Sequence, residues 1–239
     1  MEASTPYTLT PYTRLIFSPF MPPQSTPNKR AAFTRRLLAW FRTAARDLPW
    51  RRTRDPYRVL VSEFMLQQTQ VSRVLDFYPR FLRRYPDLEA LARATPRAVR
   101  EAWEGLGYYR RAANLHRLAR QVVRRHAGRV PSDPKELEQL PGVGPYTAGA
   151  VATFAFEKPA PAVDTNAARV LGRVFGCRTA KTTRAMAGRL QPRRGPTAWS
   201  FNQALIELGA LVCTARAPKC PTCPVNRLCN WYLESDNHS

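Results

Sequence analysis

The feature that most constrains this chain is a group of four cysteines close to its C-terminal end. Cys213, Cys220, Cys223 and Cys229 form a C-x6-C-x2-C-x5-C run. Thiolates this close in sequence can converge on one iron–sulfur cluster, in which each iron takes one sulfur from the protein. The spacing therefore predicts a compact loop that holds a [4Fe–4S] cluster.

Two other arrangements are compatible with the same cysteines. A structural zinc site of four cysteines usually has two tight C-x2–4-C pairs, and only Cys220 and Cys223 form such a pair. Disulfides are disfavoured because no signal peptide is visible and the cysteines crowd one segment. The fifth cysteine, Cys177, lies apart and is interpreted as a buried thiol.

The balance of charges indicates a polyanionic partner. The 239 residues include 38 Lys and Arg against 17 Asp and Glu, a formal net charge of +21. Nucleic acid is the partner that such a surface favours, and a general excess of arginine on solvated helix faces is the alternative. No run approaches the ~18 apolar residues of a membrane span. We expect a cytoplasmic protein that is associated with the nucleoid and has no membrane partner.

Helical patterns dominate the chain from Lys29 onward. Phe33, Leu37 and Phe41 recur at helical spacing. Three later helices are expected where a capping residue precedes a proline, at Asp55-Pro56, Thr95-Pro96 and Asp133-Pro134. Alternating strand patterns are scarce, so the sequence predicts an all-α fold.

The first 28 residues differ in composition from the rest of the chain. They are rich in Pro, Thr and Ser and lack helical periodicity. We predict that residues 1–28 are a disordered extension. Met21 precedes the first predicted helix and is a second candidate for the start of translation.

A glycine hairpin between two predicted helices provides a place to hold a phosphate. Leu140-Pro-Gly-Val-Gly-Pro-Tyr-Thr-Ala148 follows a short helix and precedes an apolar one. Gly142 and Gly144 let the backbone turn tightly, and the next helix offers unpaired N–H groups and a positive dipole end. An ordinary corner between two helices is the alternative, but the basic chain favours the DNA interpretation.

Several motifs together resemble one family. The hairpin, the segment Val163-Asp-Thr-Asn166 and the four-cysteine loop look like the helix-hairpin-helix DNA glycosylases related to endonuclease III and MutY. Leu48-Pro-Trp-Arg51, Ser62-Glu-Phe-Met-Leu-Gln-Gln-Thr-Gln-Val71 and Gly105-Leu-Gly-Tyr-Tyr109 resemble the MutY adenine glycosylases in particular. The resemblance spans about residues 29–232.

Glu63 is the candidate general acid. It is the only charged residue between Arg58 and Arg73 and lies among apolar residues of a predicted helix. Such surroundings raise the pKa of a carboxyl group, so that it can remain protonated near neutral pH. A solvent-facing side chain is the alternative, while the resemblance implies that Glu63 donates a proton to adenine N7.

Asp164 is the second candidate carboxylate. It precedes a helix predicted from about Asn166 to Phe175, where N-capping should give it a low pKa and keep it anionic. An anion there can stabilise an oxocarbenium-like sugar. The resemblance implies that Asn166 orients Asp164, whereas Thr165 departs from the glycine commonest in the MutY branch and is closer to endonuclease III.

Tyr146 replaces a lysine of bifunctional family members. That lysine follows the last hairpin glycine by two residues and forms a Schiff base with the sugar, which a phenol cannot do. We therefore predict little or no β-lyase activity. Tyr146 is expected to hydrogen-bond to Glu63, Asp164 or a sugar oxygen.

An enzyme that acts on a base must turn it out of the duplex and fill the gap. The resemblance implies that residues on two turns contact the opened DNA, and helix-end packing is the alternative. The residues expected to contact DNA are Leu66, Gln67, Gln68, Thr69 and Tyr108, the hairpin residues Gly142, Val143 and Gly144, and Arg216 and Lys219 in the cysteine loop.

The resemblance also implies a two-lobed architecture and a reaction. Residues 48–158 are expected to form a six-helix barrel lobe, residues 29–47 with 159–233 an iron–sulfur lobe, and residues 234–239 a tail. The implied activity is that of a monomeric, monofunctional glycosylase that removes adenine mispaired with guanine or 8-oxoguanine in double-stranded DNA. MutY proteins add a domain that reads 8-oxoguanine, which this chain is expected to lack because it ends soon after Cys229.

Two other functions are compatible with the sequence. One is a thymine or uracil mismatch glycosylase of the same superfamily, which shares the tyrosine and the glutamate. The other is a non-catalytic DNA-binding module with an iron–sulfur or zinc site. The paired carboxylates Glu63 and Asp164 argue against a module that only binds DNA.

Overall fold

The computed structural model describes residues 26–236, and every regular element in that range is a helix. The predicted all-α fold is confirmed. The α-helices are α1 (Pro27–Ala44), α2 (Pro56–Leu66), α3 (Val71–Arg84), α4 (Leu88–Arg93), α5 (Pro96–Ala102), α6 (Arg110–Arg125), α7 (Pro134–Leu137), α8 (Pro145–Phe154), α9 (Thr165–Phe175), α10 (Ala180–Leu190), α11 (Gly195–Leu211) and α12 (Asn230–Asp236). Three short 3-10 helices are η1 (Pro49–Arg51), η2 (Cys220–Thr222) and η3 (Asn226–Leu228).

The helix starts predicted from Asx-Pro and Thr-Pro pairs are all present. Asp55 accepts a hydrogen bond from the Tyr57 N–H at 2.8 Å, which caps α2. Thr95 and Asp133 cap α5 and α7 in the same way. Each following proline occupies the first helical position, where its missing N–H costs no hydrogen bond.

Both ends of the described chain are more helical than the sequence suggested. Helix α1 begins at Pro27 rather than at Lys29, because the Thr26 side chain accepts a hydrogen bond from the Lys29 N–H. Residues 1–25, which make up most of the predicted disordered extension, lie outside the described residues. Helix α12 continues to Asp236, into the segment predicted to be a tail.

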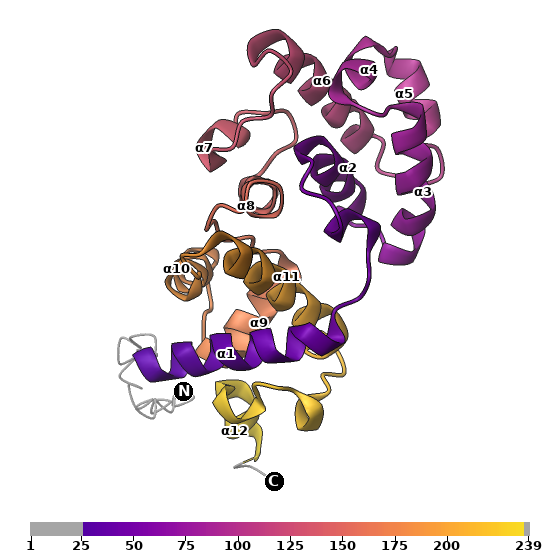
Figure 1. Ribbon diagram of the computed structural model, residues 1–239. Coiled ribbons are helices and arrows are strands. Elements are labelled where there is room, and N and C mark those ends of the chain that lie inside the picture. Colours follow the sequence, from indigo (N-terminus) through magenta and orange to yellow (C-terminus); the bar gives the residue numbers. More distant parts are fainter. Residues whose placement is uncertain (1–25, 237–239) are drawn as a thin grey trace, which may run out of the picture.

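The buried hydrophobic side chains form two cores. One core is built from residues between Leu48 and Ala162 and includes Phe64, Phe81 and Trp103. The other combines Phe33, Leu37 and Phe41 of α1 with apolar residues of α9, α10 and α11. Figure 1 shows helices α2 to α6 gathered at one end of the molecule and α1, α9 and α12 at the other.

Helix α11 joins the two halves. Its residues Trp199 and Ile206 pack against both cores, and the Trp199 ring lies 6.4 Å from the Phe154 ring of α8 in an edge-on arrangement. The Arg54 guanidinium group lies over the Trp199 ring, 4.4 Å from its centre. Within residues 26–236 no helix combines the length and the apolar character needed to span a membrane.

Candidate active site and cysteine pocket

A large open cleft brings together residues from α2, α8, α9, α10 and α11, and we call it the central cleft. All four predicted catalytic residues line it: Glu63, Tyr146, Asp164 and Asn166. Four of the predicted DNA-contact residues, Leu66, Gln67, Gln68 and Thr69, also line it. The fold therefore gathers at one surface eight residues that are separated by up to about a hundred positions in the chain.

Glu63 enters the central cleft from the buried face of α2. The residue is only 4% exposed, and its Oε2 atom has no hydrogen-bond partner among the described residues. Burial raises the pKa of Glu63 to about 7, the hydrogen bond from Tyr146 opposes this rise, and the charge of Asp164 adds to it. The carboxyl group can therefore carry a proton near neutral pH, as the sequence predicted.

Tyr146 lies in the first turn of α8, directly after the glycine hairpin. Its hydroxyl forms a hydrogen bond with the Glu63 carboxyl group. Burial, together with the charges of Glu63 and Asp164, raises the pKa of Tyr146 well above its ordinary value. The side chain is thus a neutral phenol that links the general-acid candidate to the hairpin.

Asp164 is the N-cap of α9, as predicted. Its Oδ1 accepts a hydrogen bond from the Ala167 N–H at 2.7 Å, and its Oδ2 accepts one from Asn166 Nδ2 at 2.8 Å. Burial nevertheless raises the pKa of Asp164 above its ordinary value, against the effect of these donors. The prediction of a low pKa was therefore wrong, because capping stabilises the anion less than the surrounding protein destabilises it.

Asn166 is itself held by residues on the side away from the cleft. Arg169 Nη2 donates to Asn166 Oδ1 at 2.8 Å and to the Gly209 carbonyl oxygen at 2.8 Å. Helix α11 approaches so closely here that a Cβ atom on Gly209 would lie 2.6 Å from Asn166 Cβ. This contact places the start of α9, and with it Asp164.

A charged cluster around Glu207 was not recognised from the sequence. Glu207 of α11 is fully buried and accepts hydrogen bonds from Arg46 Nη2 at 2.7 Å and from Arg51 Nη2 at 2.8 Å. Burial alone would raise the pKa of Glu207, but these two guanidinium groups lower it to about 2. Arg51 Nε also donates to Gln203 Oε1 at 2.8 Å.

This cluster contributes to the wall of the central cleft. Arg46, Arg51 and Gln203 line the cleft together with Trp50. This part of the cleft therefore combines an aromatic residue, Trp50, with the hydrogen-bonding side chains of Arg51 and Gln203. Ligand sites commonly combine apolar surface with a few polar groups in this way. The Leu48-Pro-Trp-Arg51 motif was the one available signal, since Gln203 and Glu207 lie in an otherwise apolar helix.

The two turns predicted to enter DNA are placed differently. Gln68 lines the central cleft, whereas Tyr108 does not line it and is 61% exposed. Both residues have positive φ, 55° at Gln68 and 47° at Tyr108. Such a backbone is uncommon for residues other than glycine and is retained where surrounding contacts impose it.

The glycine hairpin lies apart from the lining of the central cleft. Gly142 has a φ of 78°, and a Cβ atom there would lie 2.7 Å from Asn114, so the turn requires glycine. Gly144 is exposed and caps α8 through its backbone. Val143 is only 7% exposed, and its side chain belongs to the core.

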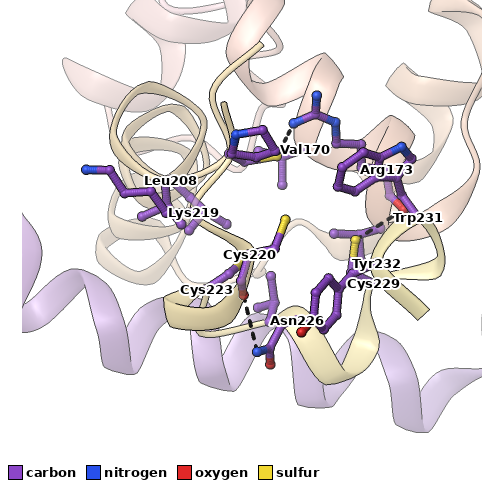
Figure 2. A pocket seen from close by; sticks show the side chains of 15 residues that line it. Val170, Arg173, Leu208, Lys219, Cys220, Cys223, Asn226, Cys229, Trp231 and Tyr232 are labelled. Atoms are coloured by element: carbon purple, nitrogen blue, oxygen red, sulfur yellow. Dashed lines mark hydrogen bonds between the residues drawn. The ribbon is translucent and has the colours of Figure 1, made fainter. Parts of the chain in front are cut away.

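The four predicted metal-binding cysteines line one pocket, here called the cysteine pocket. Figure 2 shows the sulfur atoms of Cys220 and Cys229 pointing into the space between Arg173 and Asn226. Arg173 Nη1 donates to Cys213 Sγ at 3.3 Å, and Cys229 Sγ donates to the Arg173 carbonyl oxygen at 3.4 Å. Apolar side chains, including Val170, complete the lining.

The cysteine pocket supplies four thiol donors for a metal centre. Across residues 26–236, no three Cys, His, Asp or Glu side chains are arranged so as to hold a single metal ion. A four-iron cluster is larger than one ion and needs thiolates spread around a cavity, one for each iron. The four thiols that line the cysteine pocket are the donor type and number that such a cluster takes.

Three other residues of the prediction, Lys219, Arg216 and Cys177, have different surroundings. Lys219 is exposed at the edge of the cysteine pocket, and Arg216 is exposed on the same loop. Neither lines the central cleft. Cys177, which we interpreted as a buried thiol, is only partly buried and lines the central cleft.

The chain is similar to known proteins of one family. Residues 61–193 match the family described as the HhH-GPD superfamily base excision DNA repair protein. An adenine DNA glycosylase of Mycobacterium tuberculosis is 45% identical over 218 residues, which cover 88% of this chain and 71% of that protein. The adenine DNA glycosylase of Rattus norvegicus is also 45% identical, but only 41% of its length is covered.

Relatives with another printed activity are similar as well. A thymine-DNA glycosylase of Aeropyrum pernix is 40% identical over 210 residues, which cover 84% of this chain and 94% of that protein.

Solved structures give the same fold. The structure of a thermostable thymine-DNA glycosylase superposes with a TM-score of 0.81 at 36% identity and covers 87% of this chain and 98% of the other. A non-covalent endonuclease III–DNA complex gives a TM-score of 0.77 at 26% identity, with coverage of 89% and 99%. With its hairpin, its helical fold and these matches, the chain belongs to the HhH-GPD superfamily of base excision DNA repair proteins.

Proposed function

We propose that this protein is a monofunctional DNA glycosylase that excises adenine mispaired with guanine or 8-oxoguanine. One observation carries the proposal: a buried carboxyl group with a pKa of about 7, Glu63, shares a cleft with an N-capping carboxylate, Asp164. The adenine glycosylases among its relatives support the choice of base. The motifs at Gln67-Gln68 and Gly107-Tyr108 support the same branch.

The two carboxyl groups divide the reaction between them. Once adenine is turned out of the duplex, Glu63 donates a proton to N7, which makes the base a better leaving group. The bond between C1′ and N9 then breaks, and its electron pair leaves with adenine. The Asp164 anion stabilises the positive charge that develops on the sugar, and water adds to C1′ and releases a proton. The product is an abasic site.

Tyr146 bears on whether the protein also cleaves the DNA strand after the base has left. An amine at this position could attack C1′ and form an imine, from which strand cleavage follows, but a phenol cannot. We therefore propose that strong lyase activity is absent. Borohydride should trap little or no covalent complex with abasic DNA. Efficient trapping that persists in Tyr146→Phe would contradict this proposal.

DNA binding is assigned to surfaces around the cleft. The exposed backbone of Gly142 and Gly144 and the positive end of α8 suit a phosphate group, as do the exposed cations Arg216 and Lys219. We propose that the 48–158 lobe and the lobe formed by 29–47 and 159–233 bind the duplex between them, with one protein molecule for each site.

A [4Fe–4S] cluster is proposed for the cysteine pocket, held by Cys213, Cys220, Cys223 and Cys229. Bound there, it would cross-link the loop between α11 and α12 and fix the positions of Arg216 and Lys219. Purified protein should contain about four irons and four sulfides per chain. Stoichiometric zinc without iron would contradict the assignment.

A thymine mismatch activity is the second candidate. The Aeropyrum pernix relative is matched over 94% of its length, and a thymine-DNA glycosylase structure over 98% of its length. A duplex panel with A·G, A·8-oxoguanine, T·G and U·G pairs separates the two activities. The protein is expected to release adenine from the A·G and A·8-oxoguanine duplexes. Release of only thymine or uracil would replace the proposal, and release of no base would remove it.

A further inference from the structure

Arg111 connects the turn at Gln68 with the turn at Tyr108. It lies in the first turn of α6 and is only 6% exposed. Its Nη1 donates to the carbonyl oxygens of Met65 at 2.7 Å and Phe64 at 3.1 Å, and also to that of Gln67. Its Nη2 donates to the carbonyl oxygens of Gly107 at 3.1 Å and Leu106 at 3.3 Å.

The acceptors belong to two separate segments. Three of them close the C-terminal end of α2, just before Gln68, and two lie in the turn before Tyr108. Carbonyl groups at a helix end have no partner within the helix and carry partial negative charge, so a buried cation satisfies both needs. A guanidinium group presents five N–H donors in a planar fork, which lets it bond to both segments at once.

The same side chain also supports the aromatic residue of the second turn. The Arg111 guanidinium lies 5.4 Å from the Tyr108 ring and 5.6 Å from the buried Trp103 ring. Its backbone N–H donates to the Tyr108 carbonyl oxygen at 2.9 Å. The exposed Tyr108 ring thus packs against the guanidinium group of a buried residue, Arg111.

The hydrogen bonds of Arg111 lie next to two residues with positive φ angles, Gln68 and Tyr108. A non-glycine residue in this conformation is strained, and the conformation persists only when its surroundings impose it. Arg111 contacts the backbone immediately before each of the two residues. No other side chain among residues 26–236 hydrogen-bonds to the backbone of both turns.

We infer that Arg111 is a positioning residue that sets the Gln68 and Tyr108 turns at a fixed separation, so that both can enter the duplex when the target base leaves it. The inference rests on the proposed base-excision function. It assigns to one buried arginine the task of coupling two elements of the opening apparatus. Neither Glu63 nor Asp164 depends on it for a hydrogen bond.

The test is Arg111→Lys, which keeps the charge but replaces the fork with a single ammonium group. Arg120→Lys makes the same change on the exposed face of α6 and serves as the control. The probe is a duplex with 2-aminopurine in place of the target adenine, whose fluorescence rises when the base becomes extrahelical. A second measurement compares single-turnover excision from paired DNA with excision from DNA in which the target adenine is already unpaired.

We expect the fluorescence rise and excision from paired DNA to fall about tenfold in Arg111→Lys, since small misplacements at an active site can cost up to about 10²-fold. Excision from unpaired DNA should stay within about twofold of the unaltered protein, and the alkaline limb of the pH profile should not move. Arg111→Gln, which avoids a buried charge, should give the same pattern if Arg111→Lys fails to fold.

Three outcomes would overturn the inference. These are an unchanged fluorescence rise, an equal loss of excision on both DNA substrates, and a shifted alkaline limb. The last two would place the effect of Arg111 on overall stability or on Glu63. Because the fluorescence signal needs no bond cleavage, a protein that turns out the base without excising it would contradict the proposed function and leave this inference standing.

Discussion

The two walls of the central cleft present the same functional group in opposite surroundings. On the α2 wall, Glu63 lies among apolar side chains and has one oxygen without a partner. On the α9 wall, both oxygens of Asp164 accept hydrogen bonds, from Ala167 and Asn166. Burial raises the pKa of both groups, and hydrogen-bond donors oppose that rise: Tyr146 alone at Glu63, but both Asn166 and the Ala167 N–H at Asp164. The difference in hydrogen bonding, more than the difference in burial, separates an acid from an anion.

Among the substitutions considered, Glu63→Gln should reduce the excision rate most. The substitution preserves the size of the side chain and removes the proton, so excision should fall by about 10²–10⁴-fold while DNA binding is retained. Single-turnover kinetics and a binding titration measure the two quantities. Glu104→Gln, on an exposed residue, is the control, and an equal loss in both variants would contradict the assignment.

Asp164→Asn tests the opposite wall. Asparagine can still cap α9, so the helix should remain while the negative charge is lost. Excision should fall by about 10²–10³-fold, the range observed when a group that stabilises transition-state charge is removed. Asp133→Asn changes another N-cap aspartate, that of α7, and should leave the rate unaffected. Retained turnover in Asp164→Asn would show that the anion is not required.

The pH dependence should show both walls at once. Glu63 acts while protonated and has a pKa of about 7, so the rate should fall above about pH 7, approaching tenfold per pH unit. Asp164 acts while ionised, so the rate should also fall at low pH, and its raised pKa moves that limb upward. A bell-shaped profile of single-turnover rates is expected. A rate that keeps rising with pH would exclude a protonated Glu63.

Asn166→Ala should have the smallest effect on the excision rate and should act on Asp164 alone. The variant loses the 2.8 Å hydrogen bond to Asp164 Oδ2, which favours the carboxylate anion. The pKa of Asp164 should therefore rise further, so the acidic limb should move to higher pH while the alkaline limb stays in place. The rate at neutral pH should fall by about tenfold or less. A shift of the alkaline limb alone would mean that Asn166 acts on Glu63.

The sequence predicted those parts of the molecule that depend on neighbouring residues. Helix caps, the cysteine spacing and the apolar environment of Glu63 could all be recognised from short segments. The Arg46–Glu207 ion pair could not, because its members are 161 positions apart and either side chain alone suggests a solvated surface. The pKa of Asp164 was misjudged for the same reason, since its cap is local but its burial comes from packing against distant helices.

The missing side chain at Gly209 has a consequence for how this chemistry could be adjusted. A single methyl group there would clash with the Cβ and backbone atoms of Asn166, a residue that lines the central cleft. Displacement of the start of α9 would move the negative charge relative to the sugar. The buried packing contact between α9 and α11 thus bears on the distance between the Asp164 charge and the sugar, and a substitution at residue 209 offers a way to tune the rate.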